Sequence, residues 1–259
     1  MAFPVSAEPT AFGLKRGRAS TTLAVVMHPL QPDTIALGFI WYAIFLFSTT
    51  CHEGAHALVA KLGGDLTAFH SGQVTLNPLP HMRREPLGTV VVPILSYLLG
   101  GWMVGWASAP YDPAWQRRYP RRAAWMALAG PAANFTLMLA AGVAIRVGTA
   151  LGHFREPDVA AVAFTRITES AQAAPSFAAT FLSVLFVLNL LLGTFNLLPV
   201  PPLDGNTGVT LLMPERTALR FLEWTQSSGF GFVGLLVAWV VYGKIFVYIF
   251  TVAFILLYL

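Results

Sequence analysis

The sequence predicts an all-α polytopic membrane protein. Hydrophobic residues make up 56% of the 259 positions and charged residues only 11%, whereas ordinary soluble domains carry about 25% charged residues. Several apolar runs approach the length of about 20 residues that crosses a bilayer as a helix. Little chain remains for a soluble domain, so we expect an N-terminal tail over 1–33 and one membrane-embedded domain over 34–259.

The N-terminal tail is basic and too weakly apolar to span. It carries Lys15, Arg16 and Arg18, and its one apolar run, Leu23 to Met27, is too short for a signal-peptide core or a membrane helix. The net charge of +4 comes largely from arginine clusters, which indicate membrane topology and anionic lipid headgroups and do not indicate nucleic acid. The single cysteine, Cys51, excludes an internal disulfide.

The apolar runs give the expected spans. Four runs qualify clearly, and they cover 34–60, 87–107, 122–147 and 177–199. A fifth, 230–259, is interrupted by Gly243 and Lys244. It fits either one tilted helix with a snorkelling lysine or two short helices that form a hairpin.

Two connecting segments carry turn signals. After the first span, alternation over Gln73, Val74, Thr75 and Leu76, with glycine and proline on either side, predicts a short β-hairpin or a re-entrant segment. The stretch 148–176 gathers charged residues, so we expect an extramembrane loop with one surface helix.

The first span contains the most informative motif, His52-Glu53-Gly54-Ala55-His56. Ionisable side chains inside a membrane span are costly and by default indicate a functional site. Residues four apart lie on the same face of a helix, so His52 and His56 can hold one metal ion. This is the arrangement of zinc peptidases, in which the glutamate, here Glu53, acts as the general base. The alternative is a pair of core histidines that bond to helix carbonyls or to each other.

A catalytic zinc site usually takes three protein ligands, and Asp204 is the best third candidate. Pro199, Pro201 and Pro202 end the preceding apolar helix because proline cannot continue a regular helix. Asp204 and Gly205 therefore follow a broken helix, which can aim a carboxylate into the membrane interior. A surface Asp-Gly turn is the alternative.

Three motifs together resemble the site-2 protease family of intramembrane zinc metalloproteases. They are the histidine motif, then Ala129 to Asn134, and then Asn196 to Gly205. The resemblance covers 52–205 and implies a metalloprotease domain with its catalytic core at about 34–210. It implies one Zn²⁺ per chain on His52, His56 and Asp204, with Glu53 catalytic and with Asn134 and Asn196 in substrate binding or oxyanion stabilisation. It further implies hydrolysis of peptide bonds within or near transmembrane segments of membrane protein substrates.

The resemblance extends to the compact branch without PDZ or CBS domains, with one departure. Gly72 to His81 and Pro86 to Thr89 are similar to that branch, but Met82 and Arg83 replace an aliphatic residue and an aspartate. A substrate strand could pair with the Gly72 to Leu76 segment. His81 is expected to cap this loop, the alternative being an approach to the metal.

Charge distribution predicts the orientation. Arg117, Arg118, Arg121 and Arg122 place the loop before 122–147 in the cytoplasm, and the family architecture places the active site towards that side of a prokaryotic plasma membrane. Both hold if 87–107 re-enters instead of crossing, which we prefer, although Lys15 to Arg18 then lie outside.

Two other functional classes stay open. A catalytically silent relative would bind transmembrane segments without cleaving them, but an intact Glu53 and Asp204 argue against it. A membrane metal transporter also uses mid-membrane His and Glu, but it should line a path with several polar helices. The prenyl-protein proteases would not explain the Leu203-Asp204-Gly205 motif.

Overall fold

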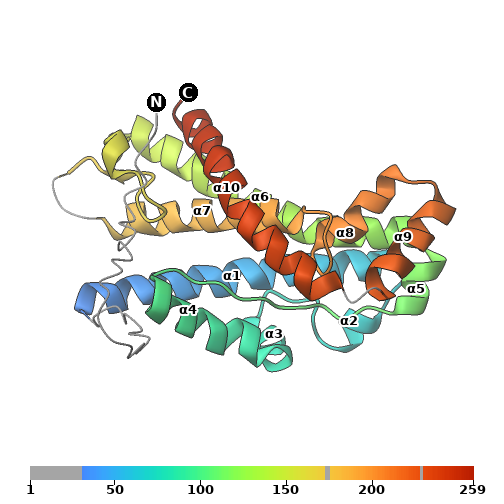
Figure 1. Ribbon diagram of the computed structural model, residues 1–259. Helices are drawn as coiled ribbons and strands as arrows, with labels where there is room; N and C mark the ends of the chain where they lie inside the picture. The colour runs from blue at the N-terminus through green and yellow to red at the C-terminus, as the bar shows by residue number, and fades with distance from the viewer. Residues whose placement is uncertain (1–30, 173–175, 228–229) are drawn as a thin grey trace, which may run out of the picture.

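A computed structural model describes residues 31–172, 176–227 and 230–259. Three long helices lie side by side, and a fourth crosses them obliquely (Figure 1). These helices, α1 (Pro32–Gly63), α6 (Pro120–Ala150), α7 (Phe177–Asn196) and α10 (Phe230–Tyr258), each contain a segment long and apolar enough to cross a membrane. The all-α polytopic prediction is therefore confirmed, while the tail over 1–30 lies outside the described residues.

Helices α1 and α6 run antiparallel because their polar ends are tied together. Helix α1 ends at Gly63 and is capped by Gly64, which has a left-handed φ of 97°. The carbonyl of Gly63, left without a partner in its helix, accepts hydrogen bonds from Trp115 Nε1 at 3.1 Å and from Arg122 Nη1 at 3.0 Å. Trp115 belongs to the short helix α5 (Pro113–Arg118), so α6 begins beside the end of α1.

Helix α7 begins where Ser176 caps it by accepting from the N–H of Ala179. It packs against α6 through a core that includes Ile145, Phe186 and Val187. It stops at Asn196, before the prolines that were expected to break it.

Helix α10 is a single helix through Gly243 and Lys244, which decides between the two forms expected for 230–259. Its rings at Trp239 and Tyr242 pack edge-on against Phe195 of α7. At its far end the Tyr258 hydroxyl donates to the carbonyl of Ile167 at 2.9 Å. Only 17% of its most apolar window is buried against the rest of the protein, as expected of a helix that faces lipid.

The region 87–107 is not one spanning helix but folds back on itself, which agrees with the re-entrant form preferred above over a full span. A five-residue π-helix, Leu87–Val91, continues into the nine-residue α4 (Val92–Gly100), which together fall short of the roughly 20 residues of a span. The chain turns at Gly101, with φ of 74°. It then returns in extended form alongside α4, where the N–H of Trp106 donates to the carbonyl of Gly88 at 3.1 Å. We call residues 102–112 the return limb.

The strand predicted at Gln73 to Leu76 is wrong. The described residues 64–86 contain α2 (Thr67–His70), turns and α3 (Pro78–Arg84), and no strand. Four alternating residues are too few to form a strand here because Asn77 already caps α3 by accepting from the N–H of Leu79. The bent segment instead rests on α1, with the carbonyl of Thr75 facing Gly54.

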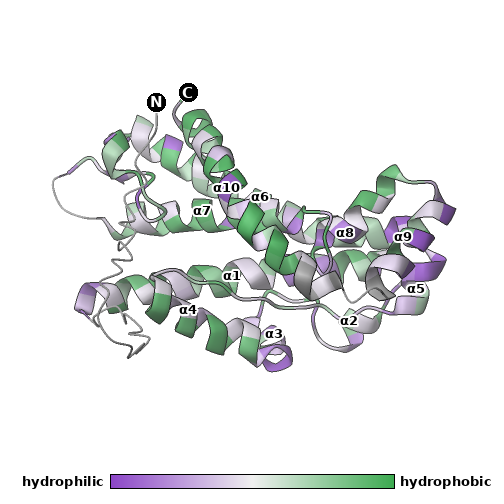
Figure 2. Cartoon of the chain, viewed as in Figure 1, coloured by the Kyte–Doolittle hydropathy of each residue, from purple (hydrophilic) through white to green (hydrophobic). Residues whose placement is uncertain are grey.

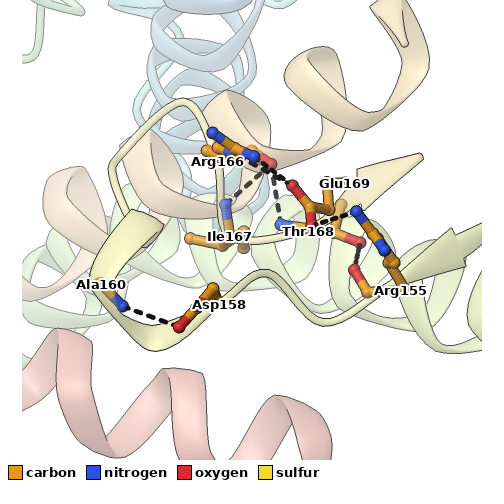
Figure 3. Close-up of polar contacts among 8 residues, drawn as sticks. Arg155, Asp158, Ala160, Arg166, Ile167, Thr168 and Glu169 are labelled. Atoms are coloured by element: carbon orange, nitrogen blue, oxygen red, sulfur yellow. Dashed lines mark hydrogen bonds and ion pairs between the residues drawn. The ribbon is translucent and has the colours of Figure 1, made fainter. Parts of the chain in front are cut away.

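The short sheet lies in the extramembrane loop between α6 and α7, where β1 (Phe154–Arg155) pairs antiparallel with β2 (Glu169–Ser170). The expected surface helix is a three-residue 3-10 turn, Val159–Ala161. Figure 3 shows that Arg155 and Arg166 both pair with Glu169. The hydroxyl of Ser183 accepts from the N–H groups of Ile167 and Thr168, which fastens this loop to α7.

The opposite end of the bundle is polar. Figure 2 shows hydrophilic residues on α5 and on α9 (Glu215–Ser227), while the long helices are mainly hydrophobic. Helix α8 (Asp204–Gly208) and the 3-10 helix Val209–Leu212 connect α7 to α9. Residues Asp204 to Gly208 thereby lie against α6, where the Cα of Gly208 faces Leu128.

Candidate metal centre

The two histidines of α1 face the carboxylate of Asp204 from α8. His52 Nε2 lies 3.0 Å from one carboxylate oxygen and His56 Nε2 lies 3.3 Å from the other. The candidate ligand atoms of these three residues all lie within 4.8 Å of one another. Residues 148 positions apart in the chain thus form one cluster among the described residues.

The Nδ1 atoms of both histidines are held by groups that accept. His52 Nδ1 lies 2.6 Å from Asn134 Oδ1, and His56 Nδ1 lies 2.7 Å from the carbonyl oxygen of Met126. An acceptor at Nδ1 places the proton there and leaves the lone pair on Nε2, which is the tautomer that binds metal. Two imidazole lone pairs and a carboxylate therefore converge on one point.

This arrangement fits a zinc ion. Two histidines and one carboxylate are a donor set of catalytic zinc sites. The buried Oδ2 of Asp204 lies 3.0 Å from His52 Nε2, which carries no proton in this tautomer, and it accepts no hydrogen bond from the described residues. The space is also shaped for an ion. A Cβ atom on Gly130 of α6 would lie 2.4 Å from His56 Nε2 and 2.5 Å from His52 Nε2, so only glycine leaves this space open.

Asp204 reaches the histidines because the chain after α7 folds back tightly. The prolines at 199, 201 and 202 prevent α7 from continuing. A Cβ on Gly205 would lie 2.1 Å from the carbonyl oxygen of Leu197, so glycine is required for this close approach. The Leu203-Asp204-Gly205 sequence therefore combines a ligand with the turn that aims it.

Glu53 lies beside the cluster and lines a cavity of about 190 Å³. The remaining lining comes from α1, α5, the start of α6, the residues around Asp204 and the return limb. Glu53 is buried, with 6% of its surface exposed. A carboxylate that is one residue from a ligand and faces a cavity can exchange a proton with a bound water or peptide.

The other predicted site residues lie elsewhere. Asn134 is fully buried behind the His52 ring, on the side away from Nε2. The Asn196 side chain donates to the carbonyl of Leu192 in its own helix at 3.0 Å and is not among the residues that line the cavity. His81 donates from Nε2 to the carbonyl of Thr75 at 3.2 Å, so it holds its own loop, as expected of a cap.

Sequence reasoning missed two parts of the site. One is Asn189 of α7, which hydrogen-bonds Asn134 at 2.8 Å; a lone amide inside an apolar span was the signal for it. The other is the return limb, of which Ala107 to Tyr111 line the cavity. No local pattern indicates that those residues meet Glu53.

Comparisons with known proteins agree with this geometry. The model of "Peptidase family M50" matches residues 40–240. A Bacillus subtilis (strain 168) protein named "Putative zinc metalloprotease YwhC" is 32% identical over 196 residues, which cover 75% of this chain and 77% of that protein. No solved structure matches the chain. The chain therefore belongs to peptidase family M50, the site-2 protease family of metalloproteases.

Proposed function

We propose that the chain is an intramembrane zinc endopeptidase that cleaves peptide bonds within or near transmembrane segments of membrane proteins. The observation that carries this proposal is the convergence of His52, His56 and Asp204 next to Glu53, inside a set of helices long enough to span a membrane. Membership of the family and the name of the Bacillus relative support it.

His52, His56 and Asp204 would hold one zinc ion per chain. Bound zinc supplies Lewis acidity and lowers the pKa of a water molecule to near 7. Glu53 faces the same cavity, where it would take a proton from water and return it to the leaving amine. The geometry favours a role for Asn134 in positioning the His52 ring. Asn196 could contact a substrate only if its side chain left the Leu192 carbonyl to which it donates.

A substrate helix must unwind before its peptide bonds become accessible. The extended return limb borders the cavity and is better placed to run beside an extended peptide than the bent Gln73 to Leu76 segment. The polar end of the bundle carries Arg117, Arg118, Arg121 and Arg122 on α5 and at the start of α6, two helices that also line the cavity. This supports an active site towards the cytoplasm of a bacterial cell.

The site argues against the two alternative classes, a metal transporter and a catalytically silent relative. A metal transporter needs a polar route across the membrane. The polar residues behind the site, Asn134, Asn189 and Ser48, are fully buried and hydrogen-bond one another, so they do not line an open path. A silent relative has no need for an acid–base group on the cavity, where Glu53 lies.

The test uses the full chain reconstituted in phosphatidylethanolamine–phosphatidylglycerol vesicles with a panel of single-span reporter proteins. Zinc content and cleavage products are measured for the wild type, Glu53→Gln, His56→Ala and Asp204→Ala. We expect near-stoichiometric zinc in the wild type and in Glu53→Gln, zinc loss in the other two, and cleavage by the wild type alone. A zinc-loaded wild type that cleaves no reporter would overturn the protease proposal in favour of a binding role.

A further inference from the structure

A chain of buried polar side chains runs from the candidate metal centre across three helices. Asn134 Oδ1 contacts His52 Nδ1 at 2.6 Å, and Asn134 Nδ2 donates to Asn189 Oδ1 at 2.8 Å. Asn189 Nδ2 then donates to the Ser48 hydroxyl at 2.9 Å and to the Leu185 carbonyl at 2.8 Å. Ser48, Asn134 and Asn189 are each 0% exposed.

The direction of these hydrogen bonds decides which nitrogen of His52 can bind metal. With Asn134 Oδ1 against the ring, Nδ1 must carry the proton and Nε2 keeps its lone pair. With the amide reversed, Asn134 Nδ2 would donate to Nδ1. The ring proton would then lie on Nε2, pointing at Asp204 and blocking the metal position.

The two histidines differ in how firmly their surroundings fix the ring nitrogen that carries the proton. His56 Nδ1 faces a backbone carbonyl, that of Met126, which can only accept. His52 Nδ1 faces a side-chain amide, whose oxygen and nitrogen ends have nearly the same shape and can exchange by rotation. Asn134 therefore cannot set the His52 tautomer alone, and a further group must fix the amide.

Asn189 is that group. The carbonyl of Leu185 can only accept, so Asn189 must turn its Nδ2 towards it. Its Oδ1 is then left for Asn134, which must present its own Nδ2 and so turn its oxygen to His52. A fixed backbone carbonyl thus determines, through two amides, the free nitrogen of a ring two helices away.

We propose that Asn189 is a positioning residue that, through Asn134, fixes the orientation in which His52 presents Nε2 to the metal. This inference rests on the proposed metal site. A residue that only packed helices together would stabilise the fold by donating to a neighbouring helix. Its loss would lower stability but would leave the metal affinity of the folded protein unchanged.

The test must separate the orientation of the Asn134 amide from simple helix packing. It compares a substitution of Asn189 that loses the hydrogen bond to Asn134 with one that keeps it. Asn189→Ser keeps a hydroxyl that can bond the Leu185 carbonyl, as serine in helices does, but it is too short to reach Asn134. Asn189→Asp, neutral when buried, can accept from Asn134 and donate to Leu185. Ser183→Ala is the matched control, because Ser183 is also a 0% exposed polar residue of α7 but bonds the extramembrane loop. Asn189→Thr fills more space than serine, so the test does not depend on one variant folding.

Zinc affinity of each monodisperse full-length protein in detergent is measured by competition with a chelating dye, together with the visible spectrum of the Co²⁺ form. Loss of an outer-shell partner costs 10–100-fold in metal affinity, so we expect about a 10-fold loss for Asn189→Ser and Asn189→Thr and a shifted Co²⁺ spectrum. Asn189→Asp and Ser183→Ala should keep the affinity and spectrum of the wild type.

Wild-type affinity and spectrum in both hydroxyl variants would overturn the inference, as would an equal loss in Ser183→Ala. A wild type that binds no zinc would instead overturn the proposed function, so the two failures are distinguishable.

Discussion

Gly130 packs so closely against His56 that a methyl group added there would lie 2.4 Å from Nε2. The same group would lie 2.5 Å from His52 Nε2, and therefore in the space between the two candidate ligands. Gly130 of α6 is thus part of the candidate metal centre, although it contributes no ligand atom.

Gly130→Ala should abolish zinc binding without unfolding the chain, because alanine favours a helix but its methyl occupies the ion's space. Metal content and the melting temperature in detergent check this. Gly243→Ala is the matched control, since a Cβ there meets nothing within 4 Å; it should keep zinc and gain up to about 1 kcal/mol from helix propensity. Stoichiometric zinc in Gly130→Ala would contradict the geometry.

Trp115→Ala should destabilise the junction of α1 and α6. Trp115 is buried with Ala60, Ala123 and Met126 and donates to the Gly63 carbonyl. Deleting such a side chain costs about 3–5 kcal/mol, whereas Trp115→Phe, which keeps most of the packing, should cost about 1 kcal/mol for the lost hydrogen bond. Unfolding in mixed micelles measures both; equal losses would mean that packing contributes little.

Asp65 should make stability depend on pH. Burial raises the pKa of its carboxyl, but hydrogen bonds from the Thr67 hydroxyl and from the N–H groups of Asp112 and Thr67 outweigh burial, so the pKa is lowered. A lowered folded pKa gives stability that is fully present above the unfolded value of about 3.9 and is lost as pH falls towards the folded value. The melting-temperature difference between wild type and Asp65→Asn should be constant above about pH 5 and shrink below pH 4. A difference independent of pH would refute this.

Trp102 and Trp239 should couple the re-entrant segment to α10. Their rings stack with centroids 5.7 Å apart and planes 14° apart. Such aromatic pairs contribute about 0.5–1.5 kcal/mol beyond burial. A double-mutant cycle with Trp102→Ala and Trp239→Ala, read as free energies of unfolding, should give a coupling of about 1 kcal/mol; strict additivity would show that the rings do not interact.

The sequence predicted the features that depend on local pattern. Apolar runs identified α1, α6, α7 and α10 because the bilayer sets helix length. The four-residue spacing of His52 and His56 predicted their shared face, and the structure brings Asp204 to that face; whether the three bind metal stays a prediction.

Two other features depend on contacts far apart in the chain that no local pattern indicates. Hydropathy cannot distinguish the re-entrant 87–107 segment from a span, because both are equally apolar; the difference lies in the turn at Gly101 and the contact between Gly88 and Trp106. Sequence spacing could not show whether the Asn134 side chain faces a substrate or the back of the His52 ring. The direction of that side chain follows from its contacts with His52 and Asn189.

The return limb presents unpaired backbone donors to the cavity beside Glu53. No hydrogen bond joins the N–H groups of Ala107 or Ala109 to another described residue, and both residues line the cavity beside Glu53. Non-helical backbone at membrane depth is tolerated only against protein or a water-filled space. The amides of Ala107 and Ala109 therefore leave hydrogen-bond donors on the cavity wall beside Glu53, where a water molecule or an extended peptide can accept from them.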